Sequence, residues 1–526
     1  MVALYPYQEE AVQRILDRKK LLLAYEMGLG KTPLSIVAME RLMETDDVSD
    51  TVLVVVLASL KYQWEAEVHV WAPESTAIVI DGTPKQRKKL FDRVDEECPD
   101  YVIVNYELVT KEFAWFSSRR WGAIIADEAT AIKGFRSKRS KALKLLASRV
   151  PVRLALTGTP ISNGKPEEIY SLMEMVDPAV LGRFDVFDRT FIVRNGSGWV
   201  ERYRNLDALH DTLEPVVARK RQLDEDVREY LPDVIDAAPT RIEWDHAGWN
   251  LYAMIANSLI SVLDEAMEEY GSSFSFNVSA HYGHADVVTD AQWAIVGQIM
   301  TRLQALRMLC SHPDVLRASA TRFNPDEEGG QGSAYAAFLL ERGELEGVTK
   351  GPKVDFLVPY LRDFLELDPE HKVVVFSSFR ESLPVLESAL SFASPRMFHG
   401  GMNAKEKNKN KLEFQNDPTS RVLISSDAGG FGVNLPEASL LVNYDLPWTA
   451  GAASQRDSRI IRASSRWPSV RLDRLLMANS VEERQWDSLR HKMAVSEAVL
   501  EGAGIDKSGG VMSTVGSLRD TLIDSL

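Results

Sequence analysis

A glycine-containing loop between an apolar run and a helical pattern carries the residues best suited to chemistry. Residues 21–24 are apolar, the next eight residues read YEMGLGKT, and a helical pattern follows to Glu44. A strand, a glycine loop, a Lys-Thr pair and a helix form the context of a phosphate-binding loop, in which backbone N–H groups face phosphate oxygens. Tyr25 takes the place of the first glycine of the strict pattern. We expect ATP to contact Met27, Gly28, Leu29, Gly30, Lys31 and Thr32.

Two adjacent carboxylates supply the second half of a site for nucleotide hydrolysis. Asp127 and Glu128 follow the apolar residues 122–126, and a buried parallel strand delivers its last residues to the ligand-binding edge of its sheet. We expect Lys31 to reach the β- and γ-phosphates, and the Thr32 hydroxyl and Asp127 to hold Mg²⁺. Glu128 is suited to orient and deprotonate the attacking water. An isolated Asp-Glu pair more often caps a surface helix, so its place after a phosphate loop is what favours catalysis.

Short apolar runs alternate with longer helical stretches in two parts of the chain, which indicates two parallel sheets of βαβ units. In the first part the runs are residues 21–24, 51–57, 101–104, 123–126 and 154–156, and in the second 373–376, 422–425 and 440–444. The sequence between the two parts is rich in helix formers, with amphipathic patterns at residues 249–270 and 292–309. We predict an α/β protein with lobe 1 at residues 1–215, a mainly helical insertion at 216–349, lobe 2 at 350–502 and a tail at 503–526.

The composition is that of a globular protein of several domains, because 526 residues are too many for one compact core. Hydrophobic residues make up 45% and no apolar run is long enough to cross a membrane, so a membrane partner is not expected. The first residues show neither the basic nor the apolar region of a secretory signal. Cys98 and Cys310 lie far apart, which fits a reducing, cytoplasmic setting.

The charge of the chain neither supports nor excludes a nucleic-acid partner. The net charge is −15, whereas a protein that holds DNA by bulk electrostatics is usually basic. Any contact with DNA must therefore come from local basic segments. The candidates are residues 85–89, 136–144, 219–221 and 405–411, each of which taken alone is typical of a solvated surface.

The ordered motifs of the first half resemble those of superfamily 2 helicases, specifically the Swi/Snf branch of DNA translocases. Residues 4–8 are similar to the segment with which that family recognises adenine, which implies that Gln8 reads the adenine edge. Two departures are Leu57, where the family has a proline, and Thr130, where it has a histidine. The resemblance, which covers roughly residues 4–500, implies roles in DNA contact or in coupling for Ser59, Trp64, Tyr106, Thr157 and Thr159.

The second half resembles the C-terminal lobe of the same family. The resemblance implies DNA or coupling roles for Ser377, Gly400, Gly430, Gly432 and Asn434, and a contact of Gln455 with the nucleotide. Arg459 and Arg462 are spaced three residues apart, which predicts that both guanidiniums share one helical face. The family places this face against ATP bound by the first lobe, so both arginines are expected to stabilise charge on the γ-phosphate. Ser458 and Ile461 depart from the family pattern.

The resemblance implies two RecA-like lobes and a DNA-dependent ATPase that translocates on double-stranded DNA, with ATP and Mg²⁺ as cofactors. Single-stranded or forked DNA remain alternative ligands, and RNA fits less well. Two other functions stay open: a strand-separating helicase of replication or recombination, and a nucleotide-gated DNA-binding module without turnover. No further targeting module is evident, so a protein recruiter is an open expectation, and the compact size suits a bacterial or viral setting in a bacterial or infected-host cytoplasm.

Overall fold

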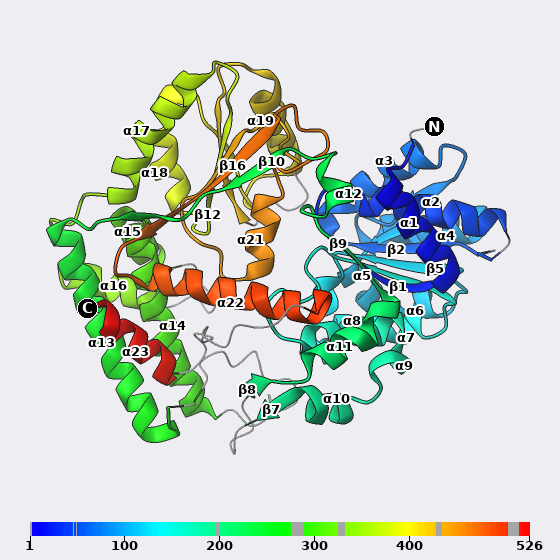
Figure 1. The fold of residues 1–526 in the computed structure, drawn as a ribbon, viewed down its shortest axis with the longest axis horizontal. Coiled ribbons are helices and arrows are strands. Elements are labelled where there is room, and N and C mark those ends of the chain that lie inside the picture. Colours follow the sequence, from blue (N-terminus) through cyan, green and yellow to red (C-terminus); the bar gives the residue numbers. More distant parts are fainter. Residues whose placement is uncertain are drawn as a thin grey trace. The chain divides into compact units, whose positions relative to one another are not determined.

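The computed structural model describes residues 3–45, 47–48, 50–194, 200–272, 274, 289–324, 332–427, 434–502 and 515–526. The chain forms two compact units (Figure 1). The first unit comprises Met1–Asn195, Val200–Leu231 and Met493–Ile505, and the second comprises Gly196–Trp199, Pro232–Lys492 and Asp506–Leu526. Each unit has its own sheet and its own apolar core, and each is described separately below.

The first unit is built on a fully parallel sheet. Its strands lie in the order β3 (Ala77–Val79), β4 (Tyr101–Asn105), β2 (Val52–Val56), β5 (Ala123–Asp127), β6 (Val152–Leu156), β1 (Lys20–Tyr25) and β9 (Val217–Lys220). The five strands predicted in this part are confirmed. Because all the strands run in the same direction, their carboxyl ends meet at one edge of the sheet, where ligands bind in such folds.

Helices cover both faces of this sheet, so its strands read as continuous apolar runs rather than alternating ones. Alternate residues of one strand enter two different cores: Leu22 packs in one, Leu21 and Leu23 in the other. The helices are α1 (Pro6–Arg18), α2 (Lys31–Glu44), η1 (Ala58–Leu60), α3 (Lys61–Trp71), α4 (Pro84–Glu97), α5 (Tyr106–Lys111), α6 (Phe113–Ser117), η2 (Ala129–Ile132), α7 (Lys138–Ala147), α8 (Glu167–Val176), α9 (Pro178–Leu181), α10 (Phe184–Phe191), α11 (Leu206–Leu213), η3 (Glu214–Val216) and α12 (Glu225–Arg228). An antiparallel hairpin, β7 (Ile192–Arg194) and β8 (Val200–Tyr203), completes the unit.

The second unit contains another parallel sheet. Its strands lie in the order β10 (Asp233–Asp236), β16 (Ser469–Met477), β15 (Leu440–Asn443), β12 (Val373–Ser377), β14 (Val422–Ser426) and β13 (Arg396–Phe398), and β11 (Thr240–Ile242) also pairs with β16. The three strands predicted here are confirmed, as is the α/β class with two parallel-sheet lobes.

The helices of the second unit are α13 (His246–Tyr270), α14 (Asp290–Ser311), α15 (Pro313–Arg322), α16 (Ala334–Glu341), α17 (Pro352–Leu367), α18 (Ser382–Ala389), η6 (Ser391–Ala393), α19 (Ala404–Asn416), α21 (Ala450–Asp457), α22 (Val481–Glu501) and α23 (Val515–Ser525). Most of them share one apolar core with the sheet, whereas α19 and α21 contribute no residue to that core and α22 continues from Met493 into the first unit. The predicted amphipathic helices correspond to α13 and α14. Among the helices of the described ranges, none is both long and apolar enough to cross a membrane.

The strands β3, β7, β8, β13 and β16 were not predicted. Two further segments differ from the predicted domain organisation. Residues 217–242 were expected to begin a helical insertion, but they form β9, which joins the first sheet, and β10 and β11, which join the second. The expected tail contains α23, which packs against α13 (Figure 1). The division of the chain into four domains at residues 215, 349 and 502 stays a prediction.

Candidate functional site

The loop between β1 and α2 has the geometry of an anion cradle. Gly28 and Gly30 have φ angles of 86° and 79°, a left-handed conformation that glycine adopts without strain. Helix α2 begins at Lys31, and its N-cap, Gly30, offers no side-chain hydrogen bond to the first turn. Thr32 lies in that same first turn. The first N–H groups of a helix carry positive partial charge and bind phosphate when no side chain caps them.

The Lys31 ammonium lies against the start of this loop. Its Nζ atom donates to the carbonyl oxygens of Tyr25, at 2.8 Å, and Glu26, at 3.1 Å. Tyr25 stands where the strict pattern has glycine because its side chain points into the core: it is 3% exposed, and its hydroxyl donates to the Tyr7 carbonyl oxygen at 3.0 Å. The Tyr25 side chain therefore belongs to the core of the unit.

Gln8 of α1 contacts the loop directly. Its Nε2 donates to the Leu29 carbonyl oxygen at 3.1 Å, and its Oε1 accepts from the Tyr5 backbone N–H at 3.0 Å. A Cβ at Gly30 would lie 2.2 Å from Gln8 Nε2, so a larger residue would displace the Gln8 amide, and the φ angle of 79° also favours glycine. The structure thus brings the predicted adenine-reading residue next to the predicted phosphate loop.

Asp127, the last residue of β5, is buried and held by two donors. Its Oδ2 accepts from the Trp64 indole Nε1 at 2.8 Å, and its Oδ1 accepts from the Glu128 backbone N–H, also at 2.8 Å. Burial raises the pKa of Asp127 above its ordinary value, while the Trp64 hydrogen bond and the positive charge of Lys31 oppose that rise. A buried carboxylate of this kind near a lysine is the donor set expected for a magnesium ion.

Glu128 leaves the strand with a strained backbone. Its φ angle of 48° lies in the left-handed region, which costs a non-glycine residue roughly 1–2 kcal/mol. The Tyr106 hydroxyl donates to the Asp127 carbonyl oxygen at 2.7 Å and supports the same turn. Strain that surrounding contacts maintain is common at functional sites, because it directs a side chain that regular geometry would turn elsewhere.

The predicted coupling segment packs on the phosphate loop. Thr157 is buried, and its Oγ1 accepts from the Thr159 backbone N–H at 3.2 Å. A Cβ at Gly158 would lie 3.2 Å from Met27 of the loop, so the two segments are in close contact. A displacement of one segment must therefore move the other.

Arg219 of β9 and Gln222 in the segment after it hold the loop after β1 in place, partly through Glu26 of that loop. The Arg219 guanidinium donates to the Ala24 carbonyl oxygen at 2.8 Å and to Glu26 Oε1 at 2.9 Å. Glu26 Oε2 accepts from the Gln222 backbone N–H at 2.9 Å, and Gln222 Nε2 donates to the Met27 carbonyl oxygen at 2.8 Å. The basic run at residues 219–221 was the only sequence signal, and it indicated a surface instead.

The residues proposed for DNA contact in the first unit fall into two groups. Ser59 in η1 is exposed, and Thr159 is partly exposed. Trp64 and Tyr106 are buried, 2% and 1% exposed, and both bond to Asp127. Their side chains are not available to DNA, so they connect the segments after β2 and β4 to the acidic pair instead.

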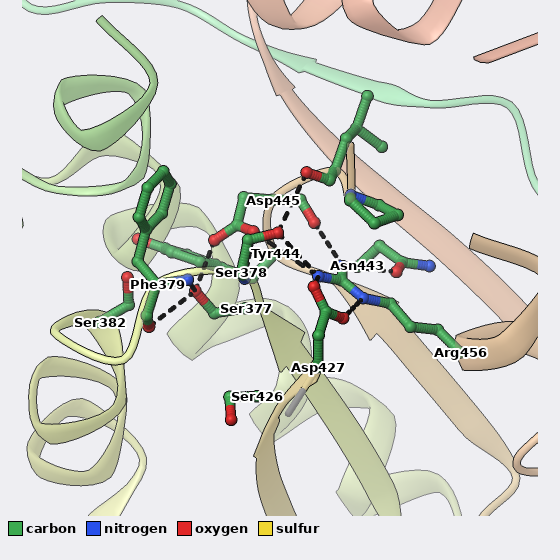
Figure 2. Close-up of polar contacts among 12 residues, drawn as sticks. Ser377, Ser378, Phe379, Ser382, Ser426, Asp427, Asn443, Tyr444, Asp445 and Arg456 are labelled. Atoms are coloured by element: carbon green, nitrogen blue, oxygen red, sulfur yellow. Dashed lines mark hydrogen bonds and ion pairs between the residues drawn. The ribbon is translucent and has the colours of Figure 1, made fainter. Parts of the chain in front are cut away.

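In the second unit, the corresponding strand ends are tied together by Arg456 (Figure 2). Its guanidinium donates to Asp427 Oδ1 at 2.6 Å and Oδ2 at 3.0 Å, to Asn443 Oδ1 at 3.1 Å and to the Asp445 carbonyl oxygen at 2.7 Å. It also donates to the Ser378 hydroxyl at 2.9 Å. Arg456 is 2% exposed, and with every donor nitrogen paired to protein it is a structural clamp that sequence reasoning missed.

Ser377 belongs to the same network. Its hydroxyl donates to Asp445 Oδ2 at 2.5 Å, and Asp445 Oδ1 accepts from the Ser378 backbone N–H at the same distance (Figure 2). Ser377 is fully buried. Its polar group is thus committed within the protein, at the ends of β12 and β15.

The prediction that Arg459 and Arg462 share one helical face is wrong. Helix α21 ends at Asp457, and the Arg459 backbone N–H bonds to the Arg456 carbonyl oxygen while its own carbonyl accepts from Leu435. Tertiary hydrogen bonding therefore replaces the next turn. The two side chains still lie near each other and are buried: burial and the charge of Arg459 lower the pKa of Arg462 to about 9. In the described part of the chain, Arg462 Nε has no hydrogen-bond partner.

The remaining predicted positions of the second unit are placed as follows. Gly400 and Asn434 are exposed, and Gln455 lies half-buried on α21. Gly430 and Gly432 lie outside the described residues.

The residues of the first unit fit a magnesium–nucleotide ligand. An uncapped helix N-terminus and a lysine suit a polyphosphate, and Thr32 and the buried Asp127 provide the oxygen ligands that Mg²⁺ prefers. The orphaned Nε of Arg462, buried beside a second arginine, suits an anion in the second unit.

Comparisons with known proteins agree with this arrangement. The SNF2-related domain matches residues 7–315, and the helicase conserved C-terminal domain matches residues 353–464. The chain is 25% identical to the transcription regulatory protein SNF2 of Saccharomyces cerevisiae over 516 residues, which is 95% of this chain and 28% of that protein. It is 26% identical to the ATP-dependent helicase brm of Drosophila melanogaster over 518 residues, which is 96% of this chain and 29% of that protein.

The chain therefore spans less than a third of the length of these two relatives. Among solved structures, the helicase domain of Pyrococcus furiosus Hef superposes with a TM-score of 0.52 at 17% identity, covering 92% of this chain and 98% of that one. This likeness shows that the two sheets are RecA-like lobes. The chain belongs to the family of proteins that carry an SNF2-related domain followed by a helicase C-terminal domain.

Proposed function

We propose that the chain is an ATP-driven motor that moves along double-stranded DNA. The observation that carries the proposal is the group at the carboxyl edge of the first sheet: an uncapped α2 N-terminus, Lys31, and the buried Asp127 beside the strained Glu128. Family membership supports it, because a relative is named an ATP-dependent helicase. We also propose the reducing, cytoplasmic setting that the sequence favours.

We assign the nucleotide contacts to residues that already lie together. Backbone N–H groups of residues 27–32 and the Lys31 ammonium bind the phosphates, and Thr32 and Asp127 hold Mg²⁺, which when bound neutralises charge on the phosphates. Gln8 binds the adenine edge. Its bonds to Leu29 and Tyr5 use one N–H and one Oε1 lone pair, so the amide keeps a second donor and a second acceptor site for the base.

Glu128 is the proposed catalytic base. Its left-handed backbone turns it away from the direction of β5, and the Tyr106 and Trp64 bonds to Asp127 fix the neighbouring carboxylate. Two adjacent carboxylates with separate supports can hold a metal and a water at the same time. Trp64 and Tyr106 are positioning residues in this scheme.

Arg459 and Arg462 are proposed to supply positive charge to the γ-phosphate. Two buried guanidiniums close enough to lower a pKa repel each other, and a phosphate anion would relieve that repulsion. A ligand that interacts with both lobes would favour one arrangement of them, and its hydrolysis would remove the preference. Alternating grip on DNA would convert this cycle into steps, with Ser59, Thr157, Thr159, Gly400, Gly430, Gly432 and Asn434 as contact or coupling positions.

A phosphate-release assay with duplex, forked and single-stranded DNA and with RNA tests the proposal. Stimulation by blunt duplex DNA, and displacement of a triplex-forming strand without unwinding of a fork, are the expected results. Unwinding of the fork would indicate a strand-separating helicase. Nucleotide-dependent DNA binding with no phosphate release would show a gated binding module and would overturn the motor.

A further inference from the structure

One stretch of this acidic protein contains basic residues but no acidic ones. Residues 129–166 contain no Asp or Glu, although the chain carries 76 acidic residues and a net charge of −15. Segregation of this kind produces a local positive potential that the net charge hides. The basic residues of the stretch are Lys133, Arg136, Lys138, Arg139, Lys141, Lys144, Arg149, Arg153 and Lys165.

Some of these cations are committed to contacts within the protein. Arg153 is buried and donates to backbone carbonyl oxygens, and Lys144 donates to Glu174 at 2.7 Å. By contrast, Lys138, Lys141 and Arg149 are exposed and form no ion pair with any residue in the described ranges. These three positions, which we call the α7 cations, remain available to an anionic partner.

The α7 cations lie along one short path. Residues three and four apart share a helix face, which places Lys138, Lys141 and Leu145 together, and Arg149 follows just beyond the end of α7. The path from the first cation to the last covers about 15 Å, the length of roughly four base-pair steps of duplex DNA. Flexible lysine side chains can reach phosphates over such a path without one fixed geometry.

A groove of about 630 Å³ runs beside this path. It is lined by the polar or charged residues Arg136, Lys141, Lys144 and Ser148 and by the apolar residues Phe135 and Leu145. The acidic residue in the lining is Glu174, and Lys144 already pairs with it. The groove therefore presents positive charge rather than a mixed surface.

We propose that the α7 cations and this groove bind the phosphate backbone of duplex DNA, which selects one of the four candidate basic segments and extends it to Arg149. The inference rests on the proposed DNA motor. It favours DNA over an acidic protein because the surface offers unpaired cations with one strongly exposed apolar side chain, Leu145 at 54%. The same acid-free stretch continues through Thr157 and Thr159, so the contact is joined to the coupling segment by a short part of the chain.

Substitution of the three α7 cations in the full chain tests this inference. The variant Lys138→Gln/Lys141→Gln/Arg149→Gln is compared with Lys85→Gln/Lys88→Gln/Lys89→Gln on α4. The α4 lysines belong to another candidate segment, residues 85–89, and are also exposed without an ion pair to a described residue. The acidic residues Asp92, Asp95, Glu96 and Glu97 follow them on the same helix and offset their charge, so we expect no DNA contact there. The affinity for a labelled 30-base-pair duplex is measured from 50 to 300 mM salt, together with ATP hydrolysis in the absence of DNA.

We expect the α7 variant to bind duplex DNA at least roughly tenfold more weakly at 0.1 M salt, and the slope of log affinity against log salt to fall by about 2–3. The α4 variant and the charge-conserving Lys138→Arg/Lys141→Arg/Arg149→Lys should keep the wild-type slope, and basal hydrolysis should be unchanged in all three. An α7 variant with the slope of the α4 variant overturns the inference while leaving the motor intact. Binding of polyglutamate, a model acidic protein, is measured in parallel. Loss of polyglutamate binding in the α7 variant without loss of DNA binding would overturn the inference in favour of an acidic protein partner. Wild-type protein that neither binds duplex DNA nor is stimulated by it overturns both proposals.

Discussion

The carboxyl edges of the two sheets use polar residues in opposite ways. At the first edge, the helix N-terminus is uncapped, and Lys31 donates to two backbone carbonyl oxygens at the start of its own loop. At the second edge, Arg456 bonds to Asp427, Asn443, Asp445 and Ser378, and its donors are filled by protein (Figure 2). The carboxyl edge of a parallel sheet thus offers a potential ligand site. Whether a ligand can bind there depends on whether the charged side chains at that edge are already paired within the protein.

The largest expected effect comes from breaking the first edge. Lys31→Ala and Glu128→Gln should each lower ATP turnover by at least roughly 100- to 1,000-fold, because they remove a phosphate contact and the proposed base. Circular dichroism and the melting temperature should stay close to wild type. Phosphate release measures the effect, and full activity in either variant would refute the site assignment.

The second prediction separates the two kinds of arginine. Arg456→Ala leaves the buried Asp445 and the partly exposed Asp427 without their cation, which should cost about 3–5 kcal/mol and lower the melting temperature by roughly 10 °C. Arg462→Ala should leave the melting temperature unchanged or raise it, since its burial already penalises the charge, yet reduce turnover about 100-fold or more.

Arg466→Ala is the matched control for both arginines. Arg466 is 46% exposed at its side chain, and its acidic partner among the described residues is the exposed Glu370, so its loss should change stability by less than about 0.5 kcal/mol. If Arg462→Ala destabilised the protein as much as Arg456→Ala, Arg462 would be a structural residue like Arg456 and not a ligand-binding one.

The third prediction uses the hydrogen bond that supports Asp127. Trp64→Phe keeps the aromatic ring but removes the indole N–H that lowers the pKa of Asp127. Asp127 must be ionised to hold Mg²⁺, so activity falls as pH decreases through its pKa. A higher pKa in the variant moves the acid limb of the pH–rate profile to higher pH. An unshifted acid limb with a merely lower plateau would show that Trp64 acts only through packing.

The smallest effect concerns the brace behind the phosphate loop. Glu26→Gln weakens the bond to Arg219 at a partly buried position, and we expect the KM for ATP to rise about three- to tenfold with kcat little changed. Glu10→Gln is the control, because Glu10 is 71% exposed and lies 3.8 Å from Lys220. Equal kinetics in the two variants would show that the bond between Glu26 and Arg219 does not affect nucleotide binding.

Much of the fold could be predicted because the central strands are buried on both faces. Strands such as β1, β2 and β5 are continuous apolar runs, and the glycine loop and the acidic pair follow two of them directly. The edge strands β9 and β10 were missed because they are short and carry charged residues among the apolar ones. A period-two or fully apolar signal does not exist in them.

The residues of the site could be predicted from the sequence, but the hydrogen bonds that hold them in place could not. Lys31, Asp127 and Gln8 lie together as their motifs suggested, whereas the Trp64 bond to Asp127 joins residues far apart in sequence. The helical-face inference for Arg459 failed because its carbonyl bonds to Leu435, a tertiary contact that no local spacing encodes. The role of Arg456 was missed for the same reason, because its hydrogen-bond partners follow other strands and are distant in sequence.

Because Glu128 has a left-handed backbone, the residue that is best for catalysis at this position differs from the residue that is best for stability. Glycine is the residue that tolerates a φ angle of 48° without penalty, so Glu128→Gly should fold more stably while losing the proposed base. A library of variants sorted only for thermal endurance would therefore enrich an inactive protein at this one position. A library sorted for both properties would retain glutamate, and that pattern of enrichment would mark Glu128 as catalytic without a single kinetic measurement.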